Sequence, residues 1–159
     1  MGRVIVALVM GAGFTLPGQT VGQQSAEEEV IAVVEAVFEG MASGDTEALR
    51  AIMLPESQLL AMGATGPRWR TGASFAEGFE RREEPVIERM WNPQVSIEGP
   101  IASLWTPYDV YIGDRWSHCG TDSFQLALTE DGWKVAFISY TVQQPPACER
   151  HPGGPPGAR

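Results

Sequence analysis

Basic residues are scarce in this chain. Lysine and arginine number 11 against 20 aspartates and glutamates, which gives a formal net charge of −9 at pH 7, and Lys134 is the only lysine. No cluster of basic residues stands out along the sequence. Binding to a nucleic-acid backbone requires concentrated lysine and arginine, so the composition argues against nucleic acid as a partner. The acidity is most simply a charge that favours solubility.

Several motifs of common catalytic and cofactor sites are also missing. The chain has no glycine-rich phosphate loop and no G-x-S-x-G nucleophile motif. Its histidines are His118 and His151, and its cysteines are Cys119 and Cys148. Cys119 directly follows His118, so their side chains point to opposite faces of a strand, and three converging metal ligands are hard to assemble. We therefore expect neither a bound metal nor a cofactor.

The apolar run near the N-terminus is too short to cross a membrane, which takes about 20 helical residues. It covers residues 4–16 behind a short basic start, and a polar segment with small residues follows. This pattern is typical of a signal peptide. We predict a signal peptide over residues 1–24 with cleavage near Gly22, hence an exported protein, periplasmic or secreted, without a membrane span in the mature chain. A buried first helix or strand is the alternative.

The cysteines allow a single disulfide. In an exported protein they would be in an oxidising compartment, where a bridge between Cys119 and Cys148 would pin the C-terminal tail to the sheet. Two free thiols are the alternative, because spacing alone does not establish the geometry that a disulfide needs.

Residues 25–144 fit a single domain. Residues 25–28 read Ser-Ala-Glu-Glu, a capping box, and apolar residues at helical spacing follow, so a long amphipathic helix is predicted. Asp45 is the predicted cap of a second, shorter helix, and either Thr71 or Ser74 that of a third. Short strands are predicted at residues 57–62, 86–91 and 95–97, and a brief strand or a loop at residues 68–70.

Residues 101–142 are predicted to form three longer strands. Glycine-containing turns at residues 113–114 and 130–132 divide this stretch into antiparallel neighbours. From residue 145 onward the chain is rich in proline and glycine, so residues 145–159 are predicted to be a disordered tail. Helices segregated from an antiparallel sheet indicate the α+β class.

The segment at residues 68–70 reads Arg-Trp-Arg. Two arginines around a tryptophan can bind an anion or stack on a ligand. A surface strand with one buried ring is the commoner reason for such a group, and it is the interpretation that we favour here.

Several local strings resemble the nuclear transport factor 2-like superfamily. They are Ser-Gly-Asp at residues 43–45, Glu-Arg-Met-Trp-Asn-Pro at 88–93, His-Cys-Gly at 118–120 and Asp-Gly-Trp-Lys at 131–134. The similarity spans about residues 26–144 and is closest to the SnoaL-like and putative lumazine-binding branch. It implies a cone-shaped, curved antiparallel sheet around a long N-terminal helix (a cystatin-like α+β roll), a cavity at the open end and a homodimer through the sheet. It does not imply a reaction, because one fold carries many functions.

The pairing of the first two long strands predicts which side chains share a face. A hairpin that turns at residues 113–114 pairs Tyr111 with Trp116. Continued without interruption, this register places Asp109 opposite His118, about 5 Å away at Cβ. We therefore predict a pocket lined by the side chains on this face, which are Trp105, Asp109, Tyr111, Trp116, His118, Asp122 and Phe124.

Two kinds of function fit this face. The first is non-catalytic binding of a small apolar or aromatic ligand in the pocket, with or without dimerisation. The second is an isomerase, dehydratase or hydrolase in which His118, with Asp109 or Asp122, acts as acid and base. In a third interpretation, His118 and Asp109 only satisfy each other's hydrogen bonds. No catalytic residue can be assigned from the sequence, and the lack of a complete catalytic set favours binding.

Overall fold

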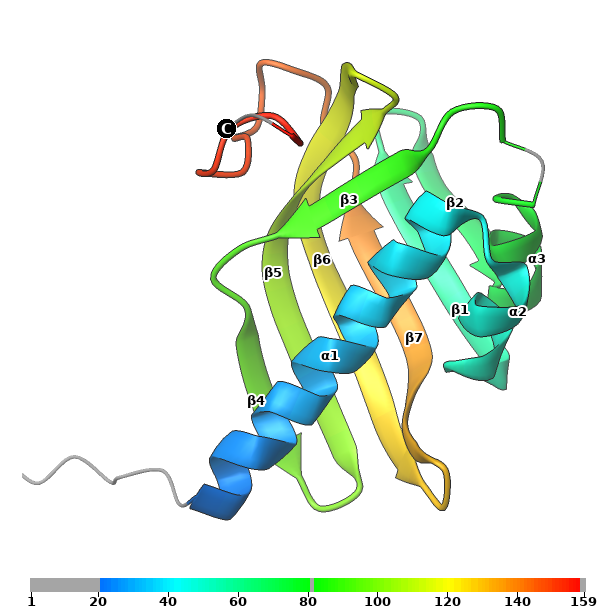
Figure 1. The fold of residues 1–159 in the computed structure, drawn as a ribbon, viewed down its shortest axis with the longest axis vertical. Helices are drawn as coiled ribbons and strands as arrows, with labels where there is room; N and C mark the ends of the chain where they lie inside the picture. Colours follow the sequence, from blue (N-terminus) through cyan, green and yellow to red (C-terminus); the bar gives the residue numbers. More distant parts are fainter. Residues whose placement is uncertain (1–20, 81, 158–159) are drawn as a thin grey trace, which may run out of the picture.

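The computed structural model describes residues 21–80 and 82–157. Most of the predicted signal peptide, residues 1–20, lies outside the described residues. The described residues form three helices and a seven-stranded sheet (Figure 1). In chain order the elements are α1 (Val21–Ser43), α2 (Thr46–Ala51), β1 (Met53–Gly63), β2 (Gly66–Thr71), α3 (Gly72–Glu77), β3 (Val86–Met90), β4 (Gln94–Glu98), β5 (Ile101–Ile112), β6 (Arg115–Thr129) and β7 (Gly132–Thr141).

Helix α1 lies across the concave face of the sheet (Figure 1). It begins at Val21, before the predicted capping box, and the Ser25 hydroxyl donates to the carbonyl of Gly22 at 2.9 Å instead of capping the helix. Like the other described helices, α1 is not apolar enough over its length to cross a membrane. Its buried face consists of apolar residues at helical spacing, which are Val30, Val34, Val37, Phe38 and Met41.

Helices α2 and α3 begin where the sequence predicts their caps. The Asp45 side chain accepts a hydrogen bond from the backbone N–H of Ala48 at 2.9 Å. Thr71, rather than Ser74, caps α3, and its hydroxyl accepts from the backbone N–H of Ser74 at 3.2 Å. Each cap satisfies a backbone donor that the first helical turn leaves without a partner. The two helices pack against each other at one end of the sheet (Figure 1).

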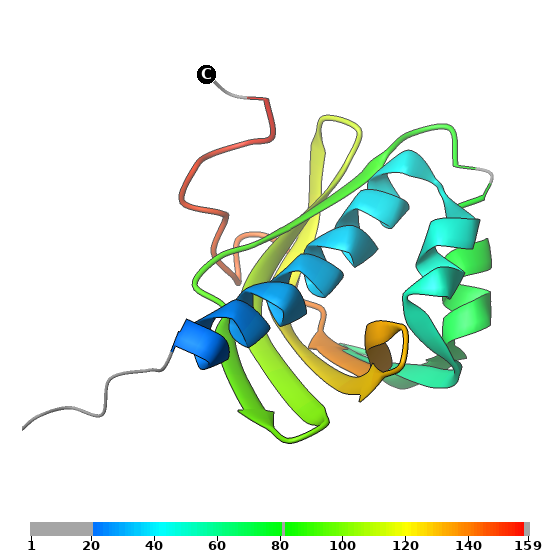
Figure 2. The same ribbon diagram turned by 60° about the horizontal axis from the view of Figure 1, so that its bottom comes forward.

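The strands are arranged in the order β2-β1-β7-β6-β5-β3, with β4 also paired to β5. Every pair is antiparallel except β1 with β7. Positive φ angles of 56° at Gly113 and 92° at Gly132 form the two turns that the sequence predicts between the long strands. The sheet curves around α1 without closing (Figure 2), so the predicted α+β class and the curved sheet around a long N-terminal helix are confirmed.

The hairpin of β5 and β6 contains one extra residue. Its turn pairs as predicted, but farther along Val110 pairs with His118, so Ser117 is left over as a β-bulge. A shift of one residue exchanges the faces of the side chains that follow. The predicted pairing of Asp109 with His118 is therefore wrong, because Asp109 lies opposite Cys119.

Residues 142–157 lie against the outer face of the sheet, in contrast to the disordered tail that their composition predicts (Figure 1). A disulfide joins Cys119 to Cys148, whose Cα atoms are 5.9 Å apart, and this is the bridge that the sequence offers as one alternative. Arg89 donates a hydrogen bond to the carbonyl of Gly154 at 2.6 Å. Because proline and glycine bury little apolar surface, the disulfide and these polar contacts hold the segment in place.

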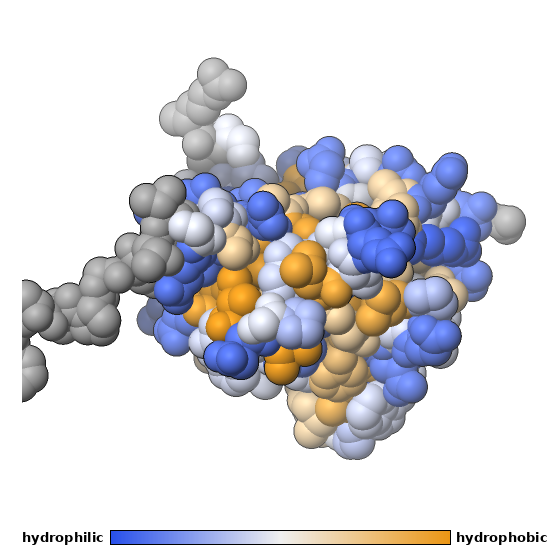
Figure 3. Space-filling model, turned by 90° about the horizontal axis from the view of Figure 1, so that it is seen from below, coloured by the Kyte–Doolittle hydropathy of each residue, from blue (hydrophilic) through white to orange (hydrophobic). Residues whose placement is uncertain are grey.

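The β4–β5 and β6–β7 turns form the lower end of the sheet in Figure 1. Seen from that end, apolar side chains gather among charged ones (Figure 3). Ile101 and Leu128, which lie next to these turns, are 61% and 47% exposed. The candidate site described below lies toward the opposite end.

Candidate functional site

A cavity of about 160 Å³ lies between α1, α3 and the inner face of the sheet. Its volume resembles that of apolar cavities that hold a single aromatic ring, and the opening at the mouth leaves room for a somewhat larger ligand. Its apolar lining is Val37, Phe38, Met41, Leu59, Phe75, Phe79, Val86, Val110, Ile112, Phe124 and Ile138. Its polar lining is Arg70, Arg82, Glu88, Tyr108, His118, Asp122 and Tyr140.

Glu88 and Asp122 are neighbouring carboxyl groups in the cavity, placed so that one can donate a hydrogen bond to the other when it is protonated. Asp122 is only 2% exposed, and its Oδ2 atom has no donor among the residues that the structure describes. Burial raises the pKa of Asp122 well above its ordinary value, and the neighbouring Glu88 charge raises it further. Burial also raises the pKa of Glu88 to about 7, against a lowering effect of the hydrogen bond with Asp122. The pair therefore keeps a proton to higher pH than two isolated carboxyl groups would.

The sequence reasoning missed Glu88 as a site residue. Val86, two positions earlier on β3, is buried and lines the cavity, so strand alternation places Glu88 on the same face. Glu88 also pairs with Val110, another cavity residue. The alternation along β3 was therefore a signal that could have identified it.

His118 lies in the cavity beside Tyr108, with ring centroids 5.9 Å apart. Burial lowers the pKa of His118, and the positive charge of Arg68 lowers it further, so the imidazole is neutral at pH 7. Its Nδ1 lies 3.0 Å from the Ser117 hydroxyl. The Tyr108 hydroxyl donates to the carbonyl of Thr141 at 2.8 Å, and burial raises its pKa, so it stays protonated. Tyr108 was also missed, because the unrecognised bulge assigned it to the wrong face.

Asp109 lies on the opposite face of the sheet. It is fully buried, and its carboxylate accepts two hydrogen bonds from Arg89, at 3.0 Å from Nε to Oδ1 and at 2.6 Å from Nη2 to Oδ2. The backbone N–H of His151 adds a third at 2.9 Å. Asp109 therefore binds an arginine and the tail, and the predicted partnership with His118 is corrected.

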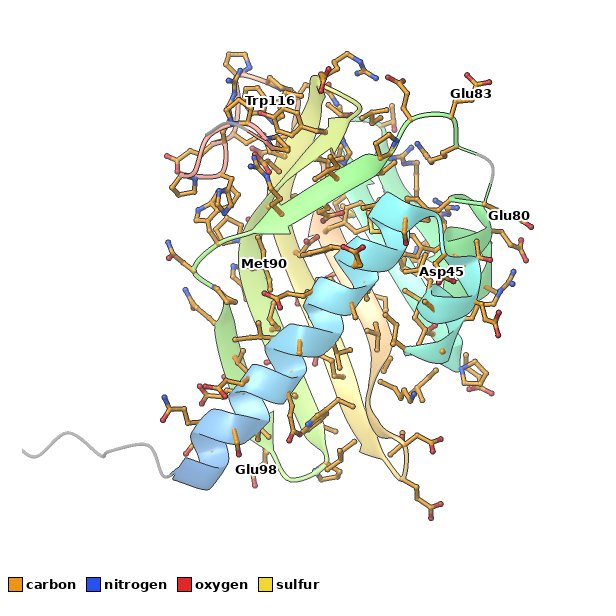
Figure 4. The ribbon with its side chains drawn as sticks, in the orientation of Figure 1. Asp45, Glu80, Glu83, Met90, Glu98 and Trp116 are labelled. Carbon is orange, nitrogen blue, oxygen red and sulfur yellow. A yellow bond between two sulfur atoms is a disulfide. The ribbon has the colours of Figure 1, made fainter. Side chains whose placement is uncertain are left out.

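The structure divides the predicted pocket residues into two groups. His118, Asp122 and Phe124 line the cavity. The others lie on the outer face, where Trp105 is 56% exposed. Tyr111 lies under Arg89, whose guanidinium is 5.3 Å from the centroid of the tyrosine ring. Trp116 packs against the tail, and the guanidinium of Arg150 is 4.1 Å from its ring centroid. Figure 4 shows Trp116 beside the C-terminal tail. The bulge at Ser117 explains this division, because it changes which residues of β5 share a face with His118.

A metal centre finds no support in the part of the chain that the structure describes. No three His, Cys, Asp or Glu side chains among residues 21–80 and 82–157 are grouped so that they could hold a metal ion. The cysteines are joined to each other. The chemistry available in the cavity is therefore that of a carboxyl pair, a neutral imidazole, two phenols and the guanidinium groups at its mouth.

Solved structures of similar shape share the fold. A nuclear transport factor 2-like protein of unknown function from Silicibacter pomeroyi is 20% identical with a TM-score of 0.60, and the match covers 76% of this chain and 98% of the other. A "putative dehydratase" of the same family from Streptomyces avermitilis is 14% identical with a TM-score of 0.61, over 76% and 97% of the two chains. A protein of unknown function with a cystatin-like fold from Nostoc punctiforme is 12% identical with a TM-score of 0.61, over 81% and 98%.

Among curated proteins no match is found. The family model described as "Putative lumazine-binding" matches residues 25–141, which is nearly the whole α+β domain. The strings quoted from the sequence, the curved sheet around α1 and the solved structures all agree with this match. The chain therefore belongs to the family that this model describes as "Putative lumazine-binding", and it shares its fold with the nuclear transport factor 2-like structures.

Proposed function

We propose that the domain binds a small planar ligand of one or two rings in the cavity between α1 and the sheet. The observation that carries this proposal is the lining, in which aromatic and aliphatic side chains surround one pair of carboxyl groups. Concave, mostly apolar cavities with a few converging polar groups are the usual form of small-molecule sites. The binding is non-catalytic in this proposal.

Glu88 and Asp122 suit a ring that carries both a donor and an acceptor. A protonated carboxyl donates a hydrogen bond and its ionised neighbour accepts one. A heterocycle with adjacent N–H and C=O groups offers the complementary pattern. Lumazine, which the family description names, is a bicyclic ring of this kind and is therefore the first ligand to test.

Isothermal titration calorimetry of the full chain with lumazine tests this function. The wild-type protein should bind one equivalent, and Val110→Trp, which fills the cavity, should abolish binding. Asp122→Asn should weaken it about tenfold, because a hydrogen bond to a charged group is altered. Trp105→Ala on the outer face is the matched control and should change nothing. Binding that survives Val110→Trp in a folded variant contradicts the proposal.

A second candidate is an enzyme that transfers a proton at carbon, as in an isomerase or dehydratase. The observation that favours it is a carboxyl with a pKa of about 7, at Glu88, beside Asp122, a carboxyl whose pKa burial raises well above its ordinary value. The Glu88 carboxylate would take the proton from a carbon next to a carbonyl. The electron pair of the broken C–H bond would form an enolate, whose oxygen would accept a hydrogen bond from Asp122. Asp109 has no part in this candidate, because it lies on the other face.

Proton exchange separates the two candidates. The bicyclic ketone 2-tetralone, incubated with the protein in deuterium oxide, can be followed by nuclear magnetic resonance. Catalysis requires faster deuterium incorporation next to the carbonyl with the wild-type protein and loss of that rate with Glu88→Gln. A rate equal to that of buffer alone excludes proton abstraction from this class of ketone.

We also propose an exported homodimer. The disulfide is consistent with an oxidising compartment, and mass spectrometry of the mature chain would locate the cleavage predicted near Gly22. For the dimer, the support is a pair of exposed tryptophans, Trp69 and Trp105, which are 60% and 56% exposed. Large exposed aromatic side chains are typical of interface positions.

A further inference from the structure

We propose that the ligand of the cavity is an anion of the carboxylate class, whose charged group is held at the cavity mouth by Arg70 and Arg82. This inference rests on the proposed ligand-binding function and adds the charge of the ligand and its orientation. Both arginines line the cavity, and both are exposed to solvent, which places them at its mouth.

The two guanidinium groups are anchored on α3 and the residue that ends it. Arg70 Nη2 donates to the carbonyl of Ser74 at 2.6 Å, and Arg82 Nε donates to the carbonyl of Gly78 at 3.0 Å. An arginine carries five N–H donors, so each of these bonds fixes the group and leaves other donors available. Preorganised donors of this kind lose little conformational freedom on binding an anion.

The same arginines lie over two aromatic rings of the cavity wall. Arg70 is 5.8 Å from the ring centroid of Phe75, and Arg82 is 5.3 Å from that of Phe79. The two rings contact each other edge to face at 5.0 Å. An apolar surface is thus joined directly to two cations, which is the pattern that an aromatic or other apolar carboxylate requires.

Neither arginine is neutralised within the described part of the protein. The ion pairs found there are Arg50–Glu77 and Arg89–Asp109. In a chain with a formal net charge of −9, two arginines without a carboxylate at ion-pair distance at the mouth of one cavity are unusual. An anionic ligand would supply the missing partner through charge-assisted hydrogen bonds.

The charge distribution also sets the orientation of the ligand. The acidic pair of Glu88 and Asp122 lies inside the cavity, where a second anion would be repelled. The charged end of the ligand therefore faces the arginines at the mouth, and its ring faces the interior. Interior polar atoms of the ring remain free to contact the carboxyl pair.

A matched pair of probes tests this inference on the full chain. The probes are 2-naphthoate and 2-naphthamide, which share a ring system and differ in charge. Titration calorimetry should give naphthoate at least about tenfold tighter binding than naphthamide, because hydrogen bonds to charged groups are roughly twice as strong as neutral ones. The difference should shrink as salt is raised, since exposed charges are screened.

Variants assign the effect to the two arginines. Arg70→Gln and Arg82→Gln should each weaken naphthoate binding about tenfold and weaken naphthamide binding much less, because a neutral amide makes a weaker hydrogen bond to a guanidinium than a carboxylate does. Arg150→Gln, which changes the net charge equally but lies on the outer face against Trp116, is the control and should affect neither probe. Circular dichroism establishes that each variant is folded.

The outcomes separate this inference from the function on which it rests. If both probes bind equally and the arginine variants behave like Arg150→Gln, the cavity binds ligands but the anionic class is wrong. If neither naphthoate, naphthamide nor lumazine binds, the ligand-binding function fails and the inference falls with it. The inference is supported if the protein prefers naphthoate and if Arg70→Gln and Arg82→Gln remove this preference while Arg150→Gln does not.

Discussion

Glu88 and Asp122 are acids whose ionisation the fold opposes. Burial raises the pKa of Glu88 from its ordinary value of 4.5 to about 7. The unfolded chain therefore releases this proton at lower pH than the folded protein does. Because the folded state binds more protons in this interval, the free energy of unfolding should fall as pH rises from about 4.5 to about 7 and then level off with respect to this group. The pair is thus a local cost to stability at neutral pH, which is typical of a functional site.

Glu88→Gln should remove this pH dependence. At pH 8 the variant should be more stable than the wild-type protein by about 1–3 kcal/mol, and at pH 4 the two should be nearly equal. Urea unfolding at both values measures the difference. Glu98→Gln, at the far end of the sheet (Figure 4), controls for the loss of one negative charge. An equal gain at pH 4 and pH 8 would sink the assignment of a raised pKa to this pair.

Arg89 and Asp109 form a residue pair of the opposite kind. Asp109 is fully buried, and Arg89 neutralises it through two hydrogen bonds. Arg89→Ala leaves a buried charge with one remaining donor from the His151 backbone, so the free energy of unfolding should fall by about 3 kcal/mol or more. Chemical denaturation measures the loss.

The exposed pair of Arg50 and Glu77 is the matched control for this prediction. Its nitrogen and oxygen atoms are 3.1 Å apart, but both side chains are about half exposed, at 49% and 58%. Arg50→Ala should therefore cost less than about 1 kcal/mol. Equal losses for Arg89→Ala and Arg50→Ala would show that burial does not set the strength of the pair at Asp109.

At the scale of elements, the regular parts of the fold could be predicted from the sequence because their signals are local. Helical spacing defines α1, Asp45 caps α2, and Gly113 and Gly132 mark the hairpin turns. The bulge at Ser117 could not be predicted, because the hairpin turn fixes the register only until an extra residue interrupts it. Because of this one extra residue, four of the seven predicted pocket residues lie on the outer face of the sheet.

The ordered C-terminal tail could not be predicted from local sequence patterns either. Its composition predicts disorder, yet Arg89 contacts Gly154 across 65 positions of the sequence and the disulfide spans 29. Such contacts depend on the sheet that presents them, so within residues 145–157 only Cys148 indicates one of them in advance. Glu88 is a different case. Alternation along β3 places it on the same face as Val86, so its place in the cavity could have been predicted from the sequence.

Removing the disulfide should release the tail. In the entropic account, closing a loop of this length destabilises the unfolded chain by about 3.6 kcal/mol. Cys148→Ser should lower the free energy of unfolding by a similar amount, and the amides of residues 142–157 should exchange hydrogen faster. Mass spectrometry of peptides after deuterium labelling measures the exchange. Full protection of the tail in Cys148→Ser would mean that the contacts of Arg89 and Asp109 hold it alone.

At the scale of the whole molecule, the two faces of the sheet carry different tasks. The inner face and α1 enclose the cavity. The outer face is covered by the tail where β3, β5 and β6 meet it, through Arg89, Asp109 and Trp116. Because the tail leaves the rest of the outer face open, a partner can dock there without touching the cavity.

The register shows that the two exposed tryptophans lie on this open part. Trp69 of β2 pairs with Leu60 of β1, which pairs with Ser139 of β7. From Ser139 the row continues to Ser123 of β6 and on to Trp105 of β5. Directly paired residues share a face, so both tryptophans project from the outer face, on strands far apart in one row.

If the outer face joins two copies of the chain, a charge placed on this row should separate them. Sedimentation velocity should find the wild-type protein as a dimer, and Trp69→Glu and Trp105→Glu should each shift it to the monomer, because a buried unpaired charge strongly opposes association. Leu128→Glu, which adds the same charge to an exposed position near the β6–β7 turn, is the control and should remain dimeric. Ligand binding should be unchanged in all three variants, since none of these side chains lines the cavity. A monomeric wild-type protein, or dimers that tolerate both glutamates, would place the interface elsewhere and leave the exposed tryptophans without this role.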